Sequence, residues 1–231
     1  MKDYFYEVEK PRILKILMFL KESLPKKCTR SNYQLTQNLL HKPFSYELNL
    51  QEKLQIIADE MREHLLIKEP IRILTLNNVE AGKFEMIDNF NCIYINANTN
   101  TQNFHQKIAI LAHEMSHYYL MRKHNIKKEF VKENELLTEL NAVYCGFGFL
   151  LYNGYHEEKV EIGNKIHKHK VGYISTKVIQ ETIIQTAYVR KQNPNHIMKN
   201  LDLGFKDTIT LKFKLKKLIK EYNLAMANKK Q

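Results

Sequence analysis

The stretch His113-Glu114-Met115-Ser116-His117 is the most informative part of this chain of 231 residues. It lies between Ile108 and Leu120, where apolar residues recur with helical spacing and neither Pro nor Gly intervenes. Residues four apart on a helix project from nearly the same face, so the two imidazoles can converge on one metal ion. A chance match in a histidine-rich chain is the alternative, and the helical setting argues against it.

The residue types in this stretch suit zinc chemistry. Zinc takes neutral imidazole and carboxylate ligands, and a catalytic site keeps one coordination position for water. Bound zinc lowers the pKa of that water to about 7, and a neighbouring carboxylate can take the proton during attack on a carbonyl. The sequence therefore predicts Zn2+ as cofactor, His113 and His117 as ligands, and Glu114 as general base and later proton donor.

The residues after the motif bear on the third ligand. Metzincins require Gly three residues and His six residues after the second histidine, but these positions are Leu120 and Lys123, which excludes that class. A second helical stretch, Glu135 to Ala142, carries the acids Glu135 and Glu139 on one face. An ordinary solvated helix face is the alternative interpretation of these two acids.

This second stretch resembles the glutamate helix of gluzincins, whose pattern is Glu-x-x-small-acid. The resemblance implies that Glu135 is the third metal ligand and that Glu139 orients the other nitrogen of a ligand histidine. Thr138 stands at the small position, where Ala is commoner, and Glu139 stands where Asp or Asn is commoner. Glu139 and, more distantly, Glu133 remain alternatives for the third ligand.

The surrounding regions are similar to compact minigluzincin-type metallopeptidases, the family that includes anti-repressor proteases and DNA-damage regulators. The similarity covers roughly residues 49 to 190 and implies an α+β fold, in which a small sheet packs on helices beside the motif helix and the glutamate helix. The elements expected before the motif are a helix from near Asn49 with the apolar stripe Leu50, Leu54, Ile57, Met61 and Leu65, strands Ile71 to Leu76, Lys83 to Ile87 and Cys92 to Ala97, and a hairpin turn at Asp88 to Asn91.

In zincins of this type, the strand just before the motif helix forms a sheet edge along which a peptide substrate lies extended. The run Cys92 to Asn96 matches that place, and edge pairing would supply backbone hydrogen bonds with little side-chain selectivity. An ordinary interior strand is the alternative.

The chain divides into three predicted parts. Residues 1 to 48 form an N-terminal extension with one short helix, residues 49 to 192 form the minigluzincin-like domain, and residues 193 to 231 form a basic helical segment. In the extension, the apolar residues of the short helix are Ile13, Leu14, Leu17 and Leu20. The domain ends with a helix near Lys177 to Arg190, before Asn193-Pro194-Asn195.

Charge suggests a second type of partner. The formal net charge is +11, and residues 157 to 231 carry most of the excess. There an apolar helical stripe lies opposite a row of lysines: Leu211, Leu215, Leu218, Tyr222 and Met226 against Lys212, Lys214, Lys216, Lys217 and Lys220. This segment could bind nucleic acid, although a lysine-rich solvated face is the simpler interpretation and no known nucleic-acid module accompanies it.

Composition is ordinary for a globular protein, with 44% hydrophobic and 26% charged residues. No membrane partner is expected, because the densest apolar run, Ile16 to Leu20, is far shorter than the ~20 residues a bilayer requires. Three scattered cysteines form no evident disulfide framework, and the N-terminus lacks the features of a secretory signal. These features favour the cytoplasm.

The sequence thus predicts a zinc-dependent endopeptidase that hydrolyses a protein or peptide substrate. Most such enzymes add a Tyr or His donor for the oxyanion, and Tyr173 and His156 are candidates. One alternative is a zincin-shaped regulatory protein with a structural metal, against which Glu114 argues because a structural site needs no base. The other alternative is a nucleic-acid-binding regulator that uses the basic C-terminal half.

Overall fold

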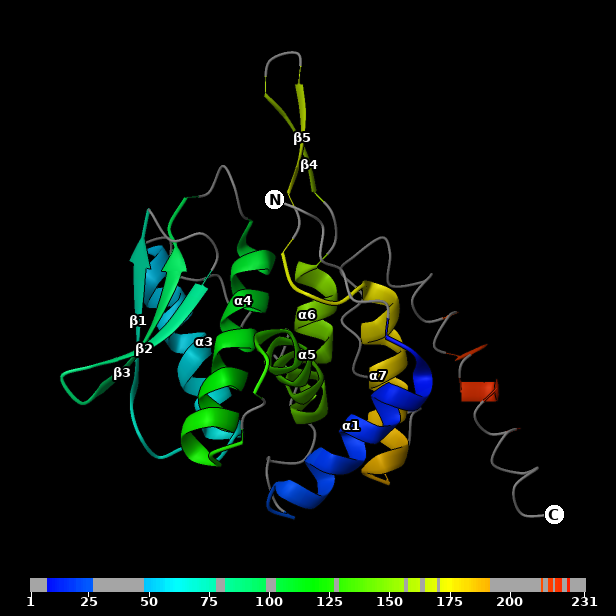
Figure 1. The fold of residues 1–231 in the computed structure, drawn as a ribbon. Helices are drawn as coiled ribbons and strands as arrows, with labels where there is room; N and C mark the ends of the chain where they lie inside the picture. Colours follow the sequence, from blue (N-terminus) through cyan, green and yellow to red (C-terminus); the bar gives the residue numbers. More distant parts are fainter. Residues whose placement is uncertain are drawn as a thin grey trace.

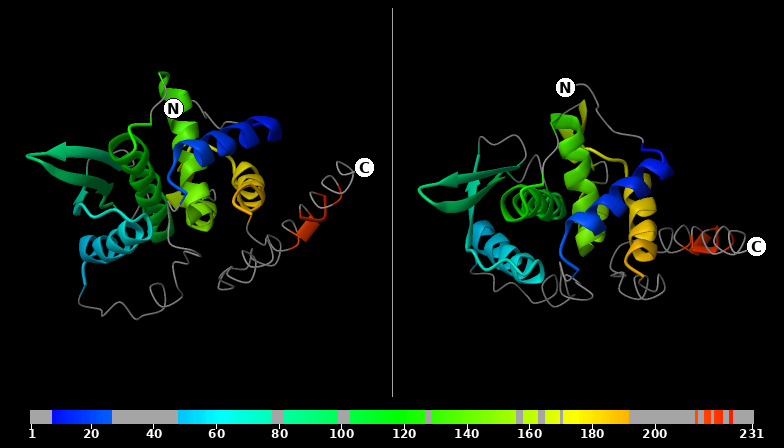
Figure 2. Two further views of the ribbon diagram at one scale, coloured as in Figure 1. Left: turned by 90° about the horizontal axis from the view of Figure 1, so that it is seen from below. Right: turned by 60° about the horizontal axis from the view of Figure 1, so that its bottom comes forward.

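The computed structural model of the chain is α+β, with a small sheet on one side and layers of helices behind it (Figures 1 and 2). It describes residues 8–26, 48–77, 82–98, 103–126, 129–155, 158–162, 165–169 and 171–191, and single positions between 213 and 224. The sheet consists of β1 (Ile71–Leu76), β2 (Gly82–Ile87) and β3 (Phe90–Asn96). The helices are α1 (Lys10–Ser23), α3 (Leu50–His64), α4 (Phe104–His117), α5 (Val131–Ala142), α6 (Gly148–Gly154) and α7 (Thr176–Val189).

The strand that precedes the motif helix is the centre of the sheet. β3 pairs in parallel with β1 and antiparallel with β2, so the strand order is β1-β3-β2. The expectation that Cys92 to Asn96 forms a sheet edge is therefore wrong. The reason is that β2 and β3 form a hairpin on one side of β3, while β1 pairs with its other side.

The hairpin turn is tighter than expected. Asp88 and Asn89 have φ values of 48° and 68°, a left-handed conformation that Asp and Asn tolerate better than most residues. Two successive residues of this kind match the right-handed twist of a hairpin, so pairing continues up to Ile87 and Phe90. β3 consequently begins at Phe90, within the predicted turn.

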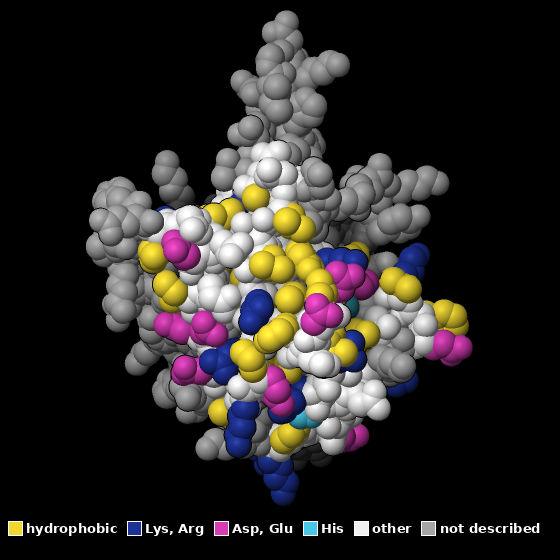
Figure 3. Space-filling view, turned by 90° about the vertical axis from the view of Figure 1, so that its left-hand side faces the viewer, with side chains coloured by type: hydrophobic (Ala, Val, Ile, Leu, Met, Phe, Trp, Pro, Cys, Tyr) yellow, Lys and Arg dark blue, Asp and Glu magenta, His cyan; other side chains and the backbone are white. Residues whose placement is uncertain are grey.

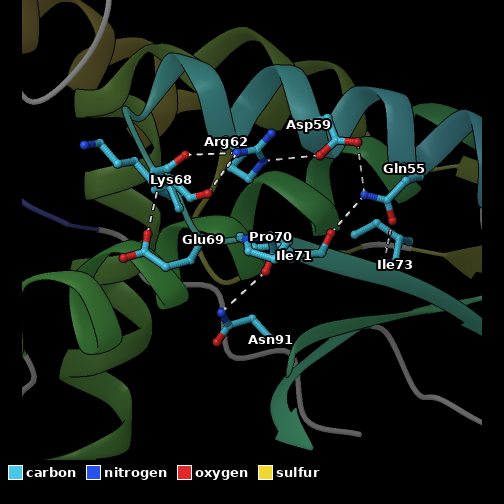
Figure 4. Close-up of polar contacts among 10 residues, drawn as sticks. Gln55, Asp59, Arg62, Lys68, Glu69, Pro70, Ile71, Ile73 and Asn91 are labelled. Atoms are coloured by element: carbon cyan, nitrogen blue, oxygen red, sulfur yellow. Dashed lines mark hydrogen bonds and ion pairs between the residues drawn. The ribbon is translucent and has the colours of Figure 1, made fainter. Parts of the chain in front are cut away.

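Helix α3 covers the free edge of β1 (Figure 4). The Gln55 side chain donates to the Ile71 carbonyl at 2.9 Å and accepts from the Ile73 N–H at 2.8 Å. Gln51 accepts from the Thr75 N–H at 3.2 Å. These amides satisfy backbone groups that another strand would otherwise use, so that β2 is the edge without such cover from the residues that the structure describes.

Capping explains where the two helices beside the sheet begin. Asn49 and Glu52 form a reciprocal capping box at the start of α3, and Asn103 and Gln106 form another at the start of α4. The predicted stripe of α3 is confirmed by the burial of Leu54, Ile57, Met61 and Leu65.

Helix α4 lies at the centre of the molecule, between the sheet and α5 and α6 (Figure 1). Every residue from Gln106 to Ser116 is buried. After His117 the chain continues as a π-helix, η1 (Tyr118–Lys123), where the sequence predicts ordinary helix to Leu120. The three consecutive side chains Tyr118, Tyr119 and Leu120 are all buried there.

The N-terminal helix belongs to the same core. α1 contains the predicted short helix, begins at Lys10, and packs against α5 and α7. Its residues Ile13, Leu17 and Leu20 are completely buried in the cluster that also contains the residues of α4. The described part of the predicted extension, residues 8–26, therefore shares its packing with the rest of the described chain.

The remaining described elements connect α5 to α7. A second π-helix, η2 (Val143–Phe147), joins α5 to α6. The hairpin of β4 (Glu158–Ile162) and β5 (Lys165–His169) then projects beyond the helices, at the top of Figure 1. Within the described part of the chain, no helix combines the length and apolar character needed to cross a membrane.

The outer face of the sheet carries apolar side chains (Figure 3). Exposed large apolar residues on this face include Leu76, Ile87 and Phe90. The Arg72 guanidinium lies 3.8 Å from the centre of the Phe90 ring and covers part of this surface.

Candidate metal centre

Two histidines of α4 and one glutamate of α5 form the centre of the candidate site. The rings of His113 and His117 lie one turn apart, with centroids separated by 4.7 Å. Glu135 Oε2 lies 3.1 Å from His113 Nε2 and 3.3 Å from His117 Nε2. One ligand atom from each of the three residues lies within 4.8 Å of the others, and this cluster could hold a metal ion.

The two alternatives for the third ligand lie elsewhere. Glu139 is fully buried on the far side of His113, with Oε1 at 3.3 Å from Nδ1. Its carboxylate accepts from the Tyr155 hydroxyl at 2.6 Å and from the Tyr173 N–H at 3.1 Å. Glu133 has a side chain that is 48% exposed and lies 3.9 Å from Arg12. Among the acids of α5, Glu135 is thus the one that faces both Nε2 atoms.

Thr138 takes part in a contact that the sequence analysis missed. Its hydroxyl lies 3.1 Å from His117 Nδ1, the nitrogen that faces away from Glu135. The pattern Glu-x-x-small-acid assigns this position only a size. The one sequence feature that indicates this contact is the Thr138 hydroxyl, since Thr stands at a position where Ala is commoner.

Glu114 lies between α4 and β2. Its side chain is almost fully buried, and its carboxylate accepts from the Phe84 backbone N–H. A Cβ atom added at Gly82 would overlap the Ile110 side chain and lie 3.1 Å from Glu114 Oε1. The absence of a side chain at Gly82 therefore lets the edge strand approach the helix beside Glu114.

The electrostatics of the cluster favour a positive charge. Burial lowers the pKa of His113, but its hydrogen bonds with Glu135 and Glu139 outweigh burial and raise it to about 10. Burial raises the pKa of Glu135, but the bonds from His113 and His117 lower it to about 2. Burial is also the main reason that the pKa of Glu114 is raised. Without a metal ion, a proton on His113 supplies the positive charge that three neighbouring carboxylates attract.

One of the two oxyanion candidates lies beside the cluster. The Tyr173 ring stacks on the His113 ring, with centroids 5.5 Å apart, and is 40% exposed. The chain reaches this position through Gly172, whose φ of 89° favours glycine and whose missing Cβ leaves room for the Tyr155 ring. His156 lies outside the described residues.

The predicted basic helix near the C-terminus is described only at single positions. The five apolar residues of its stripe lie outside them, while Lys216, Lys217 and Lys220 are described and exposed. Ile219, in the same region, is buried in the main apolar cluster. Nucleic-acid binding stays a prediction.

No family model matches the chain, and comparisons with curated proteins and with solved structures give no match either. The similarity to minigluzincin-type metallopeptidases therefore remains a prediction from the motifs.

Proposed function

We propose that this protein is a zinc-dependent endopeptidase that hydrolyses a protein or peptide substrate. The observation that carries the proposal is the approach of His113 Nε2 and His117 Nε2 to one carboxylate oxygen of Glu135, with the Glu114 carboxylate next to His113 in the chain. Two imidazoles and one carboxylate are a known ligand set of catalytic zinc, which leaves a fourth position for water or substrate.

The spacing of these atoms fits zinc. Ligand atoms about 2.1 Å from a tetrahedral ion lie about 3.4 Å from one another. The corresponding distances here, between Glu135 Oε2 and the two Nε2 atoms, are 3.1 Å and 3.3 Å. Zinc bound by these three residues would lower the pKa of a water molecule and polarise a substrate carbonyl.

Glu114 would transfer the proton. As a water molecule attacks the carbonyl carbon, the Glu114 carboxylate accepts its proton, and the carboxyl group later gives a proton to the leaving amine. Burial supports this role, because it raises the pKa of Glu114 and makes the carboxylate a stronger base. The Phe84 N–H holds the carboxylate in place from β2.

A peptide substrate would pair with the outer edge of β2, not with β3. Strand β3 is central, and Gln51 and Gln55 of α3 cover the edge of β1. β2 is the remaining edge and directly contacts Glu114 through Phe84. An extended peptide added there would have its backbone close to the proposed base.

The change Glu114→Gln tests the enzymatic part of the proposal. Gln keeps the size of the side chain but not its basicity, so zinc content should stay at the wild-type value while peptide hydrolysis falls at least ~10²-fold. Glu133→Gln is the matched control, since Glu133 lies outside the cluster. A library of peptides from a digested proteome, analysed by mass spectrometry for new termini, serves as the substrate.

Two results would count against the proposal. If the zinc-loaded wild type cleaves no peptide in the library and no protein in a lysate, the endopeptidase activity is refuted. If Glu114→Gln cleaves as fast as the wild type at equal zinc occupancy, Glu114 is not the base.

A further inference from the structure

Each ligand histidine has a partner on its far nitrogen, and the two partners are consecutive residues of α5. Glu139 lies 3.3 Å from Nδ1 of His113, and Thr138 lies 3.1 Å from Nδ1 of His117. Both Nε2 atoms therefore point toward Glu135, which lies one turn earlier on the same helix. The gluzincin pattern names an acid at the position of Glu139 and only a small residue at the position of Thr138.

The position of Thr138 is itself fixed. Ser116, the neighbour of His117 on α4, donates its hydroxyl to the Thr138 carbonyl at 2.8 Å. Asn141 of α5 donates to the Ser116 hydroxyl at 2.8 Å. Ser116, Thr138 and Asn141 are all buried, so these bonds join the two helices where water is excluded. The Thr138 hydroxyl is thus held next to the imidazole by the packing of α4 against α5.

The chemistry of imidazole gives this contact a consequence. A neutral histidine that offers Nε2 to a metal must carry its proton on Nδ1, and that N–H needs an acceptor when it is buried. A hydroxyl oxygen can accept from it and holds the ring at one orientation.

We propose that Thr138 is a positioning residue of the metal centre, whose hydroxyl accepts the Nδ1–H of His117 and directs Nε2 toward the metal ion. The inference depends on the proposed function only in that the cluster binds zinc. It extends that proposal, because it assigns a role to a residue at which this chain departs from the gluzincin pattern.

Three variants test the inference. Thr138→Val keeps the shape and removes the hydroxyl, and Thr138→Ser keeps the hydroxyl. Thr182→Val makes the same change at a fully buried threonine of α7, which lies outside the cluster and donates to the Val178 carbonyl. Zinc affinity is measured by competition with a chelator. The Nδ1–H proton of His117 is followed in the zinc-loaded, 15N-labelled protein by NMR, where a hydrogen bond slows its exchange with water.

Thr138→Val should bind zinc about 10- to 100-fold more weakly, the usual effect of losing a contact that orients a ligand. Its His117 Nδ1–H signal should disappear through fast exchange. Thr138→Ser should restore both the affinity and the signal. Thr182→Val should unfold at a lower temperature but keep the signal and an affinity within about twofold of wild type. If Thr138→Val does not fold, Thr138→Ala makes the same comparison.

The outcomes separate the two proposals. If the wild type and Thr138→Val bind zinc equally tightly, or if the His117 signal survives in the valine variant, Thr138 does not position the ligand, whereas the zinc site stands. A wild type that takes up no zinc overturns the proposed function and this inference together. Equal losses in Thr182→Val and Thr138→Val would show a general effect of helix packing and would also overturn the role of Thr138.

Discussion

Zinc and a proton should compete for His113, and pH is the perturbation that reveals the competition. With the pKa of His113 at about 10 in the metal-free protein, roughly one molecule in a thousand carries a neutral His113 at pH 7. Zinc requires the neutral ring. The zinc affinity should therefore rise about tenfold per pH unit between pH 7 and pH 9, with His113 releasing about one proton per zinc ion bound.

The same pKa shift affects the stability of the metal-free protein. A histidine whose pKa is raised on folding stabilises the fold fully below its ordinary pKa of about 6.5. That contribution is lost as the pH rises through about 10. The free energy of unfolding of the metal-free protein should thus decrease as the pH rises from 7 to 10, whereas that of the zinc-loaded protein should change less over this range.

Calorimetry measures the proton release directly. Zinc titrations at pH 7.5 in buffers with different ionisation enthalpies give the number of protons released, and chelator competition gives the affinity at each pH. The Glu139 carboxylate is one of the groups that raise the pKa of His113. In Glu139→Gln that pKa should be lower, so the rise of zinc affinity with pH should end at a lower pH than in the wild type. Glu133→Gln is the control and should behave as wild type. A zinc affinity that does not change between pH 7 and pH 9, with no proton released, would refute the reasoning.

Two further predictions concern the ligand set and the core. Glu139→Ala should weaken zinc binding about 10- to 100-fold, and Glu135→Ala should weaken it more, because losing a metal bond costs more than losing an orienting contact. Chelator competition ranks the two variants, and the reverse order would exchange the roles of Glu135 and Glu139. Leu17→Ala should destabilise the protein by about 2–5 kcal/mol in urea unfolding, because Leu17 is completely buried. Leu14→Ala, on the same helix but 44% exposed, should cost less than about 0.5 kcal/mol, and equal effects would contradict the packing of α1.

Local patterns were sufficient to predict many of the elements. The strand from Ile71 to Leu76 has the predicted bounds, and α3 begins directly after Asn49, where the side chain caps the helix. The motif helix lies where its apolar spacing places it, and the predicted helix from Glu135 to Ala142 is present but begins four residues earlier, at Val131. These features depend on residues close together in the chain, so periodicity and capping residues are enough to predict them.

The arrangement of these elements in space could not be predicted in the same way. The place of β3 at the centre of the sheet depends on which side β1 takes, and the cover of the β1 edge depends on two glutamine side chains of α3. Likewise, the contact between Thr138 and His117 depends on the rotation of α5 relative to α4. Sequence spacing gives the face of each helix but not the angle at which two faces meet.

The burial of three carboxylates is the strongest physical reason to expect a cation in this fold. Glu139 is fully buried, Glu114 is nearly so, and Glu135 has a side chain only 15% exposed. Among the described residues, the ion-pair partners of Glu135 and Glu139 are the imidazoles of His113 and His117. Apolar residues of similar size would stabilise this part of the core as well or better. A site of this composition therefore costs stability unless a bound ion offsets it, and a divalent cation held by both histidines and Glu135 would do so more completely than the single proton on His113.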